Sequence, residues 1–233
     1  MPGGFEVLYD RGMVLAVSKP PGVLTQAPPG IDSLEVRVRS FLAERAAEGA
    51  QPYLAFPHRL DRPASGAMVL ATHIRAARKL SKQFQRRTVE KTYWACVQGT
   101  VSPAEGTWRD VMRKVPGMPR GEIVEPTHPE GQSAVLHYRT LGTQPWGTWL
   151  EIILETGRTH QVRVQAAVRG HPVLGDKTYG CELPFGEQFE DVRLRAIALH
   201  ARRVVFEDPA DKQRVEVVAQ VGEAWRSLGI DVS

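Results

Sequence analysis

The chain has 233 residues, of which 42% are hydrophobic and 24% charged, an ordinary composition for a soluble globular protein with one sizeable core. No apolar stretch approaches the roughly 20 residues that span a bilayer, and the first residues lack a signal-peptide pattern. The two cysteines lack metal-ligand spacing, which favours reduced thiols and a cytoplasmic location, and the net charge of +4 favours polyanionic partners without requiring one.

The first half of the chain alternates strand and helix patterns. In chain order, we predict strands over residues 5–9 and 13–17, a helix over 33–47, a strand over 67–71, a helix over 74–86 and a strand over 90–99. Asp32 or Ser33 is expected to cap the first helix. The second helix is amphipathic, and four apolar residues are expected to face inward: Ile74, Ala77, Leu80 and Phe84.

Residues 100–132 are rich in proline, glycine and charge, and we interpret them as a long excursion of the chain. Beyond them we predict strands over 134–141 and 148–155, followed by a helix that is capped by Thr159 and ends near Arg169. A loop over 181–193, a hairpin of strands over 197–206 and 214–219, and a short helix over 223–228 are expected to complete the chain. Local strand pairs interspersed with helices favour an α+β domain, with helices flanking a mixed, largely antiparallel central sheet.

Asp61 stands out because its neighbours crowd one carboxylate between two guanidiniums. It lies in the segment HRLDRPASG of residues 58–66, between Arg59 and Arg62, at a Pro-Ala-Ser-Gly turn. A cation within about 4–6 Å lowers the pKa of a carboxyl group by roughly 1–3 units, which keeps the group ionised. A surface loop seldom needs this much fixed geometry, so Asp61 is a candidate functional residue.

The same segment resembles the HRLDxxTSG signature of the RluA family of RNA pseudouridine synthases, in which the aspartate is the catalytic residue. Ala64 stands where that pattern usually has threonine. Five further segments resemble family motifs in the same order: AVSKPPG over 16–22, KTYWACVQG over 91–99, TGRTHQVRV over 156–164, GHPVLGD over 170–176 and LHA over 199–201. The resemblance covers residues 5 to about 218. It implies the pseudouridine synthase fold and one catalytic domain over residues 1–233. Many members carry an additional RNA-binding module in front, and we expect none here.

The resemblance also implies an isomerase that converts uridine to pseudouridine in ribosomal or transfer RNA. The reaction breaks the N1–C1′ bond, rotates the base and joins C5 to C1′, so we expect no cofactor and no metal. The partner would be a structured RNA stem-loop, and nothing in the sequence requires more than a monomer.

Three residues are expected to carry the chemistry. Asp61 would supply the negative charge, by attack on C1′, by addition to C6 or by electrostatic stabilisation alone, and these routes stay open. Arg163 would keep Asp61 ionised, because an unpaired buried carboxylate costs several kcal/mol. Tyr93 would stack on the uracil and assist proton removal. The alternatives are a structural Asp61–Arg163 ion pair and a core tyrosine.

Five further residues are expected to bind substrate: His58, Arg59, Val162, Arg158 and His160. Arg59 would fill the space left by the extruded nucleotide or grip its phosphate. Val162 would line an apolar wall, although a plain core valine is the rival. His58 has the alternative of a structural histidine. Gln165 departs from the family, which commonly has histidine there, and we expect altered fine geometry rather than lost chemistry.

Two basic clusters, over residues 75–87 and 109–120, could contact RNA phosphates, or could be a solvated helix face and a loop. Two other functions compete with the isomerase. One is an RNA-binding or ribosome-assembly protein with dispensable catalysis, which would have no need of Asp61. The other is an N-glycosidic hydrolase, which would need a second carboxylate, and no matched motif contains one.

Overall fold

The computed structural model describes residues 4–231, which form two compact units. Unit 1 comprises residues 4–91, 191–194 and 201–221, and unit 2 comprises residues 92–190, 195–200 and 222–231. The expectation of one catalytic domain stays a prediction, and residues 1–3, 232 and 233 of its range lie outside the described part. Within residues 4–231, no helix is long and apolar enough to cross a membrane.

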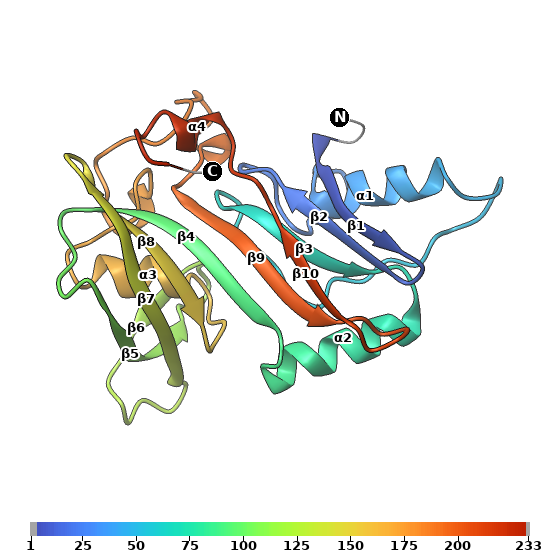
Figure 1. Ribbon diagram of the computed structural model, residues 1–233, viewed down its shortest axis with the longest axis horizontal. Coiled ribbons are helices and arrows are strands. Elements are labelled where there is room, and N and C mark those ends of the chain that lie inside the picture. The colour runs from blue at the N-terminus through green and yellow to red at the C-terminus, as the bar shows by residue number, and fades with distance from the viewer. Residues whose placement is uncertain (1–3, 232–233) are drawn as a thin grey trace. The chain divides into compact units, whose positions relative to one another are not determined.

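Unit 1 is built on strands in the order β1 (Glu6–Arg11), β2 (Val14–Lys19), β3 (Ser65–Ala71), β9 (Leu199–Glu207) and β10 (Arg214–Val218), as Figure 1 shows. The first two residues of β9 belong to unit 2. The pairs β1–β2, β2–β3 and β9–β10 are antiparallel. Residues 14–17 and 67–71 are each at most 1% exposed, so both faces of β2 and β3 are covered. The predicted hairpins at both ends of the chain are confirmed.

Two helices cover unit 1, which also contains a short 3-10 turn, η3 (Val192–Leu194). Ser33 caps α1 (Leu34–Ala43), because its hydroxyl accepts a hydrogen bond from the Val36 amide. The helix α2 (Ile74–Arg86) has the predicted bounds and packs on one face of β2, β3 and β9. The expectation that Ile74 faces inward is wrong. Ile74 is 47% exposed at the first turn, and Ala76 is buried instead.

Unit 2 contains an antiparallel sheet in the order β4 (Glu90–Gln98), β8 (Gly147–Leu154), β7 (Gln132–Gln144), β5 (Glu105–Lys114) and β6 (Gly121–Ile123). The first two residues of β4 belong to unit 1. The interpretation of residues 100–132 as a loop-like excursion is wrong for its central part, which forms β5 and β6. Only Trp108 and Met112 of β5 are buried, so the strand lacks the apolar alternation that predicts one.

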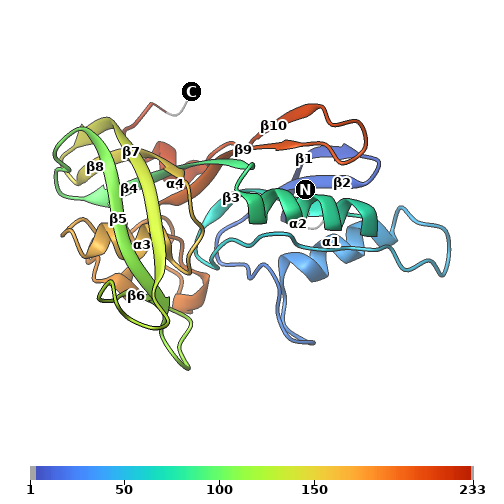
Figure 2. The ribbon, with the colours of Figure 1, turned by 90° about the horizontal axis from the view of Figure 1, so that it is seen from below.

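Three short helical elements complete unit 2: α3 (Gln161–Ala167), η2 (Lys177–Tyr179) and α4 (Glu223–Arg226). His160, in the left-handed conformation with φ 55°, is the N-cap of α3, so the prediction of a Thr159 cap is wrong. Val164 packs with Met112 of β5 and Ala134 of β7, which places α3 on one side of these strands (Figure 2). Strands paired mainly as antiparallel neighbours, with flanking helices, confirm the α+β class.

Candidate active site

In unit 1, backbone and side-chain hydrogen bonds join the segment before β3 that carries Asp61 (the Asp61 loop) to the loop after β2. The Thr25 hydroxyl donates to the Leu60 carbonyl at 2.9 Å and accepts from the Leu60 amide at 3.2 Å. The Gly22 amide donates to the Arg62 carbonyl at 2.9 Å, and Arg62 Nε donates to the Gly22 carbonyl at 2.9 Å. Bonds on both sides of Asp61 therefore hold its backbone in place, while its side chain is half-buried.

Lys19 is the centre of this junction and is fully buried. Its Nζ donates to the carbonyls of Pro20 and Val23 at 2.8 Å each and of Arg62 at 3.2 Å. Three acceptors match the three donors of an ammonium group. Burial lowers the pKa of Lys19 to about 7, while the negative charge of Asp61 acts in the opposite direction. Lys19 is thus a buried amino group that is electrostatically coupled to Asp61.

Two glycines allow the strands and loops around Asp61 to approach closely. Gly66 has φ +117°, and a Cβ there would lie 2.3 Å from the Ala201 carbonyl oxygen. Gly22 has φ +78°, and its Cβ would lie 2.8 Å from the Leu194 carbonyl oxygen. Both backbone conformations are rare for other residues, and neither position has room for a side chain. These contacts explain the glycines of the two motifs.

His58 and Arg59 have different surroundings. His58 Nε2 accepts a hydrogen bond from the Val69 amide at 2.9 Å, and its ring stacks on Phe84 of α2 with centroids 4.4 Å apart. Burial, assisted by the positive charge of Lys91, lowers the pKa of His58 to about 3, so the ring is neutral at pH 7. These contacts favour the structural alternative for His58. Arg59 is exposed, as a residue that meets RNA requires.

In unit 2, Arg163 of α3 is buried against a carboxylate that the sequence analysis did not single out. Its Nε and Nη2 donate to the two oxygens of Asp176 at 2.6 and 2.9 Å. The side chains of the pair are 4% and 1% exposed. The guanidinium also lies over the ring of Tyr179, 5.1 Å from the centroid. Asp176 and Tyr179 thereby fix the plane and orientation of the guanidinium.

Tyr179 also connects His160 to β6. Its hydroxyl accepts from the Gly121 amide at 3.0 Å, donates to the Gly121 carbonyl at 3.1 Å and lies 2.9 Å from His160 Nδ1. The Tyr179 hydroxyl thus bridges β6 and His160, and the direction of its bond with His160 Nδ1 depends on the tautomer of the ring. A Cβ on Gly121 would lie 2.4 Å from the Thr159 carbonyl oxygen, so only glycine fits beside this turn.

Two buried side-chain amides, of Gln161 and Gln165, form a hydrogen-bonded row along α3. Gln161 Oε1 accepts from the Thr156 hydroxyl at 2.7 Å and from the Arg158 amide at 3.1 Å. Gln161 Nε2 donates to Gln165 Oε1 at 3.0 Å, and Gln165 Nε2 donates to Asp110 at 2.6 Å. Gln165, the departure from the family pattern, is fully buried and hydrogen-bonded, which fits a role in the geometry of α3.

Arg158, Tyr93 and Val162 are the remaining predicted site residues of unit 2. The Arg158 guanidinium donates to the Ser133 carbonyl at 2.9 Å and to the Gln132 side chain at 2.6 Å. Tyr93 of β4 is 9% exposed and pairs with Ile152 of β8. Val162 of α3 is 3% exposed.

The predicted residues therefore fall into two groups, each held within its own unit. Unit 1 holds His58, Arg59 and Asp61, and unit 2 holds Tyr93, Arg158, His160, Val162 and Arg163. The predicted Asp61–Arg163 ion pair joins residues of different units and stays a prediction. Lys19, Asp176 and Tyr179 were missed as site residues. Lys19 and Asp176 lie in matched motifs, so a rule that examines every charged residue of a motif would have found them, whereas no sequence signal indicates Tyr179.

Comparisons with known proteins agree with these motifs. The family model described as RNA pseudouridylate synthase matches residues 13–168. A protein named as an uncharacterized RNA pseudouridine synthase of Mycobacterium bovis is 36% identical over 219 residues, covering 93% of this chain and 69% of that protein. A ribosomal large subunit pseudouridine synthase D of Xylella fastidiosa is 32% identical, covering 94% of this chain and 66% of that protein. The solved structure of human RNA Pseudouridylate Synthase Domain Containing 4 has a similar fold, with a TM-score of 0.78 at 22% identity over 97% of this chain and 94% of that one.

Proposed function

Because the chain belongs to the RNA pseudouridylate synthase family and is an isomerase acting on RNA, we propose that it converts uridine to pseudouridine in ribosomal RNA, with Asp61 as the catalytic carboxylate. The observation that carries the residue assignment is the junction around Lys19. It fixes the backbone on both sides of Asp61 and contains a buried amino group, that of Lys19, whose charge is electrostatically coupled to Asp61.

The reaction is balanced within the substrate. The N1–C1′ bond breaks, the C5–C1′ bond forms, and the proton that leaves C5 is replaced by one gained at N1. The enzyme must therefore supply a negative group at the sugar, a surface that holds the free base while it rotates, and an acceptor for the C5 proton. Asp61 supplies the negative group, and its charge is electrostatically coupled to the buried amino group of Lys19.

The residues of unit 2 are proposed to hold the base. Tyr93 offers an aromatic face and a phenol that can pass a proton, and Val162 offers an apolar wall. Arg163, already oriented by Asp176 and Tyr179, supplies a fixed positive charge for Asp61. A preorganised charge of this kind needs no reorientation when the bond breaks.

Three further residues are proposed to contact the RNA outside the reacting base. Arg59 is exposed and takes the space left by the extruded nucleotide. Arg158 and His160 border the turn before α3 and donate to the phosphate or sugar of the target nucleotide. His58 positions the loop through Val69 and Phe84 rather than by touching RNA.

Ribosomal RNA is the proposed substrate class because relatives such as the Xylella fastidiosa protein are named for the large ribosomal subunit. Transfer RNA is the competing class that the motifs leave open. A cytoplasmic location follows from this substrate and agrees with Cys96 and Cys181, which are free and buried. We propose that the monomer acts without a cofactor.

The proposal is tested by incubating the pure protein, without cofactor, with total RNA from cells that lack its gene and mapping new pseudouridines chemically. We expect modification at one or a few uridines of ribosomal RNA. Asp61→Asn should abolish turnover while RNA affinity stays within about tenfold, roughly 1.4 kcal/mol.

Glu48→Gln is the matched control, because it also removes one negative charge from an exposed position of unit 1. It should behave as the wild type. Full turnover by Asp61→Asn would disprove the catalytic assignment. RNA binding without any modification would favour the RNA-binding alternative, and release of free uracil would favour the hydrolase.

A further inference from the structure

The helix α2 carries an unusual concentration of positive charge. Its sequence, IRAARKLSKQFQR, contains no acidic residue, and its cap adds a further arginine. Six side chains are exposed cations: Arg75, Arg78, Lys79, Lys82, Arg86 and Arg87. In the part of the chain that the structure describes, the salt bridges involve none of them. The helix α1 differs, because its Arg37 and Arg39 pair with Asp32 and Glu35.

This arrangement weakens α2 as a helix. Arg75 and Lys79, Arg78 and Lys82, and Lys82 and Arg86 are like-charged neighbours four residues apart, which repel one another. Arg75 also lies at the positive end of the helix dipole. Packing of the inner face through Ala76, Leu80 and Phe84 keeps the helix folded nonetheless. Repulsion among these cations lowers the stability of the folded helix, and a row of like charges that is retained despite this cost indicates a polyanionic partner.

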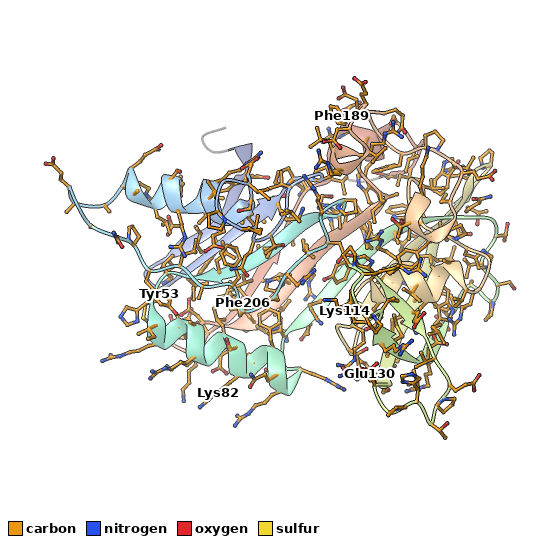
Figure 3. The ribbon with its side chains drawn as sticks, turned by 180° about the vertical axis from the view of Figure 1, so that it is seen from behind. Tyr53, Lys82, Lys114, Glu130, Phe189 and Phe206 are labelled. Carbon is orange, nitrogen blue, oxygen red and sulfur yellow. The ribbon has the colours of Figure 1, made fainter. Side chains whose placement is uncertain are left out.

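The cations lie on the side of α2 opposite to its contact with the Asp61 loop. At about 100° per residue, Arg75, Arg78, Lys79, Lys82 and Arg86 fall within roughly a 100° arc facing away from Phe84. Figure 3 shows Lys82 pointing outward from α2, while Phe206 lies on the inner side of the helix. Phe84 itself stacks on His58, so α2 borders the Asp61 loop through its inner face.

A groove of about 540 Å³ continues this surface between α2 and the β9–β10 hairpin. Five cations and two carboxylates line it: Lys79, Lys82, Arg86, Lys212, Arg214, Glu90 and Glu207. Gln83 joins α2 to the hairpin: its side-chain Nε2 donates to the backbone carbonyl of Glu207 at 2.7 Å, and its Oε1 accepts from the backbone N–H of Glu207 at 2.9 Å. Lys79 Nζ also donates to the Pro209 carbonyl at 2.6 Å. The groove is therefore preformed, and its charge stays net positive.

We propose that the outer face of α2 and this groove bind the phosphate backbone of the substrate RNA outside the loop that carries the target uridine. The inference rests on the proposed function for the identity of the polyanion. From residue 75 to residue 86 the helix spans about 16 Å, at 1.5 Å per residue. A duplex carries one phosphate charge per roughly 1.7 Å of its axis, so a stem along α2 offers phosphates to every cation of the array. A single extruded nucleotide at Asp61 cannot reach the opposite side of α2, whereas the stem that continues from it can.

The test uses the full chain with Asp61→Asn, so that binding is measured without turnover. The probes are a fluorescein-labelled RNA stem-loop with a long stem and the same loop on a stem of a few base pairs. Arg78→Gln with Lys82→Gln removes two cations of the array. Each phosphate contact makes the binding constant fall with salt concentration raised to a power of roughly 0.7–0.9. The loss of two contacts should therefore weaken binding of the long stem about 25- to 60-fold at 0.1 M salt, relative to 1 M, where this contribution vanishes. The salt slope should fall by roughly 1.4–1.8, and binding of the short stem should change little.

Arg39→Gln with Arg45→Gln is the control, because it removes the same charge from cations that pair with Glu35 and Asp10 in unit 1. It should leave affinity and salt slope unchanged. In an active background the α2 variant should raise KM for the long stem and leave kcat unchanged. Its melting temperature should be equal to or above that of the parent, since it removes repulsion within the helix.

An unchanged affinity and salt slope for the long stem would overturn the proposal, as would equal losses on the long and short stems. Binding to phosphatidylserine vesicles in preference to RNA would assign the surface to a membrane and overturn it as well. The outcome does not depend on Asp61 chemistry. A wild-type protein that binds the long stem through α2 but forms no pseudouridine would refute the proposed function and leave this surface standing.

Discussion

Replacement of Asp176 tests whether the buried pair with Arg163 is a source of stability, of activity, or of both. Both side chains are almost fully buried and share two short hydrogen bonds. Asp176→Asn removes the negative charge and leaves a buried guanidinium, and breaking a buried pair in this way costs about 3–5 kcal/mol. With a urea m-value of about 3 kcal/mol/M, the midpoint of unfolding should fall by roughly 1–1.7 M.

Tryptophan fluorescence measures this change in the relevant part of the chain. All five tryptophans, at positions 94, 108, 146, 149 and 225, belong to unit 2, as do Arg163 and Asp176. The double variant Arg163→Met with Asp176→Leu replaces the pair by apolar side chains of similar volume, which is often neutral or stabilising. We expect it to unfold near the wild-type midpoint and to show no turnover.

The two variants together separate the roles of the pair. A loss below about 1 kcal/mol in Asp176→Asn would refute the claim that the buried charge depends on Asp176. A double variant as unstable as the single one would show that packing, not an unbalanced charge, causes the loss. A stable double variant with normal turnover would remove Arg163 from the active site.

Three further predictions concern buried polar groups. Lys19 has a folded-state pKa near 7 against an ordinary 10.5, so between these pH values the unfolded chain binds more protons and the free energy of unfolding rises with pH. Lys19→Met should remove that rise, measured by urea unfolding followed by circular dichroism, and an unchanged dependence of the unfolding free energy on pH would contradict the reasoning. His58 should stay neutral down to about pH 4, because burial lowers its pKa to about 3, and ring NMR signals that shift between pH 7 and 5 would disprove this. Gln165→Leu should lower the free energy of unfolding by about 1–3 kcal/mol, since Asp110 and Gln161 lose a partner, and tryptophan fluorescence showing no loss would argue against the buried amide row.

The sequence predicted the helices and strands best where burial follows a regular period. The bounds of α2 were predicted correctly, because its apolar face meets the sheet over three turns. The cap of α1 was narrowed to Asp32 or Ser33, of which Ser33 is the cap, because a side-chain oxygen just before a helix acts locally on its first amides. The strands β5 and β6 were missed because β5 buries few residues and its pairing with β7 is a long-range property.

The candidate site divides in the same way. Asp61, Tyr93 and Arg163 came from motifs, and each lies in a well-defined local structure. The residues that hold them in place were harder to find, because their partners are distant in sequence. Lys19 binds the carbonyl of Arg62, 43 positions away, and Tyr179 binds Gly121, 58 positions away. Such contacts depend on how strands and loops meet, and a motif contains only one side of each.

Each unit uses a buried ion of its own to fix its part of the proposed chemistry. In unit 1 the ammonium of Lys19 is surrounded by three carbonyls, and in unit 2 Asp176 orients the guanidinium of Arg163. Burying a charged group costs several kcal/mol of folding free energy. We infer that these groups are retained because their fixed position serves the reaction. A group that is already in place when a charge develops lowers the barrier without reorganisation. It follows that the loss of Lys19 or Asp176 should act on kcat more than on KM, because both residues hold catalytic groups in place and neither needs to touch the RNA.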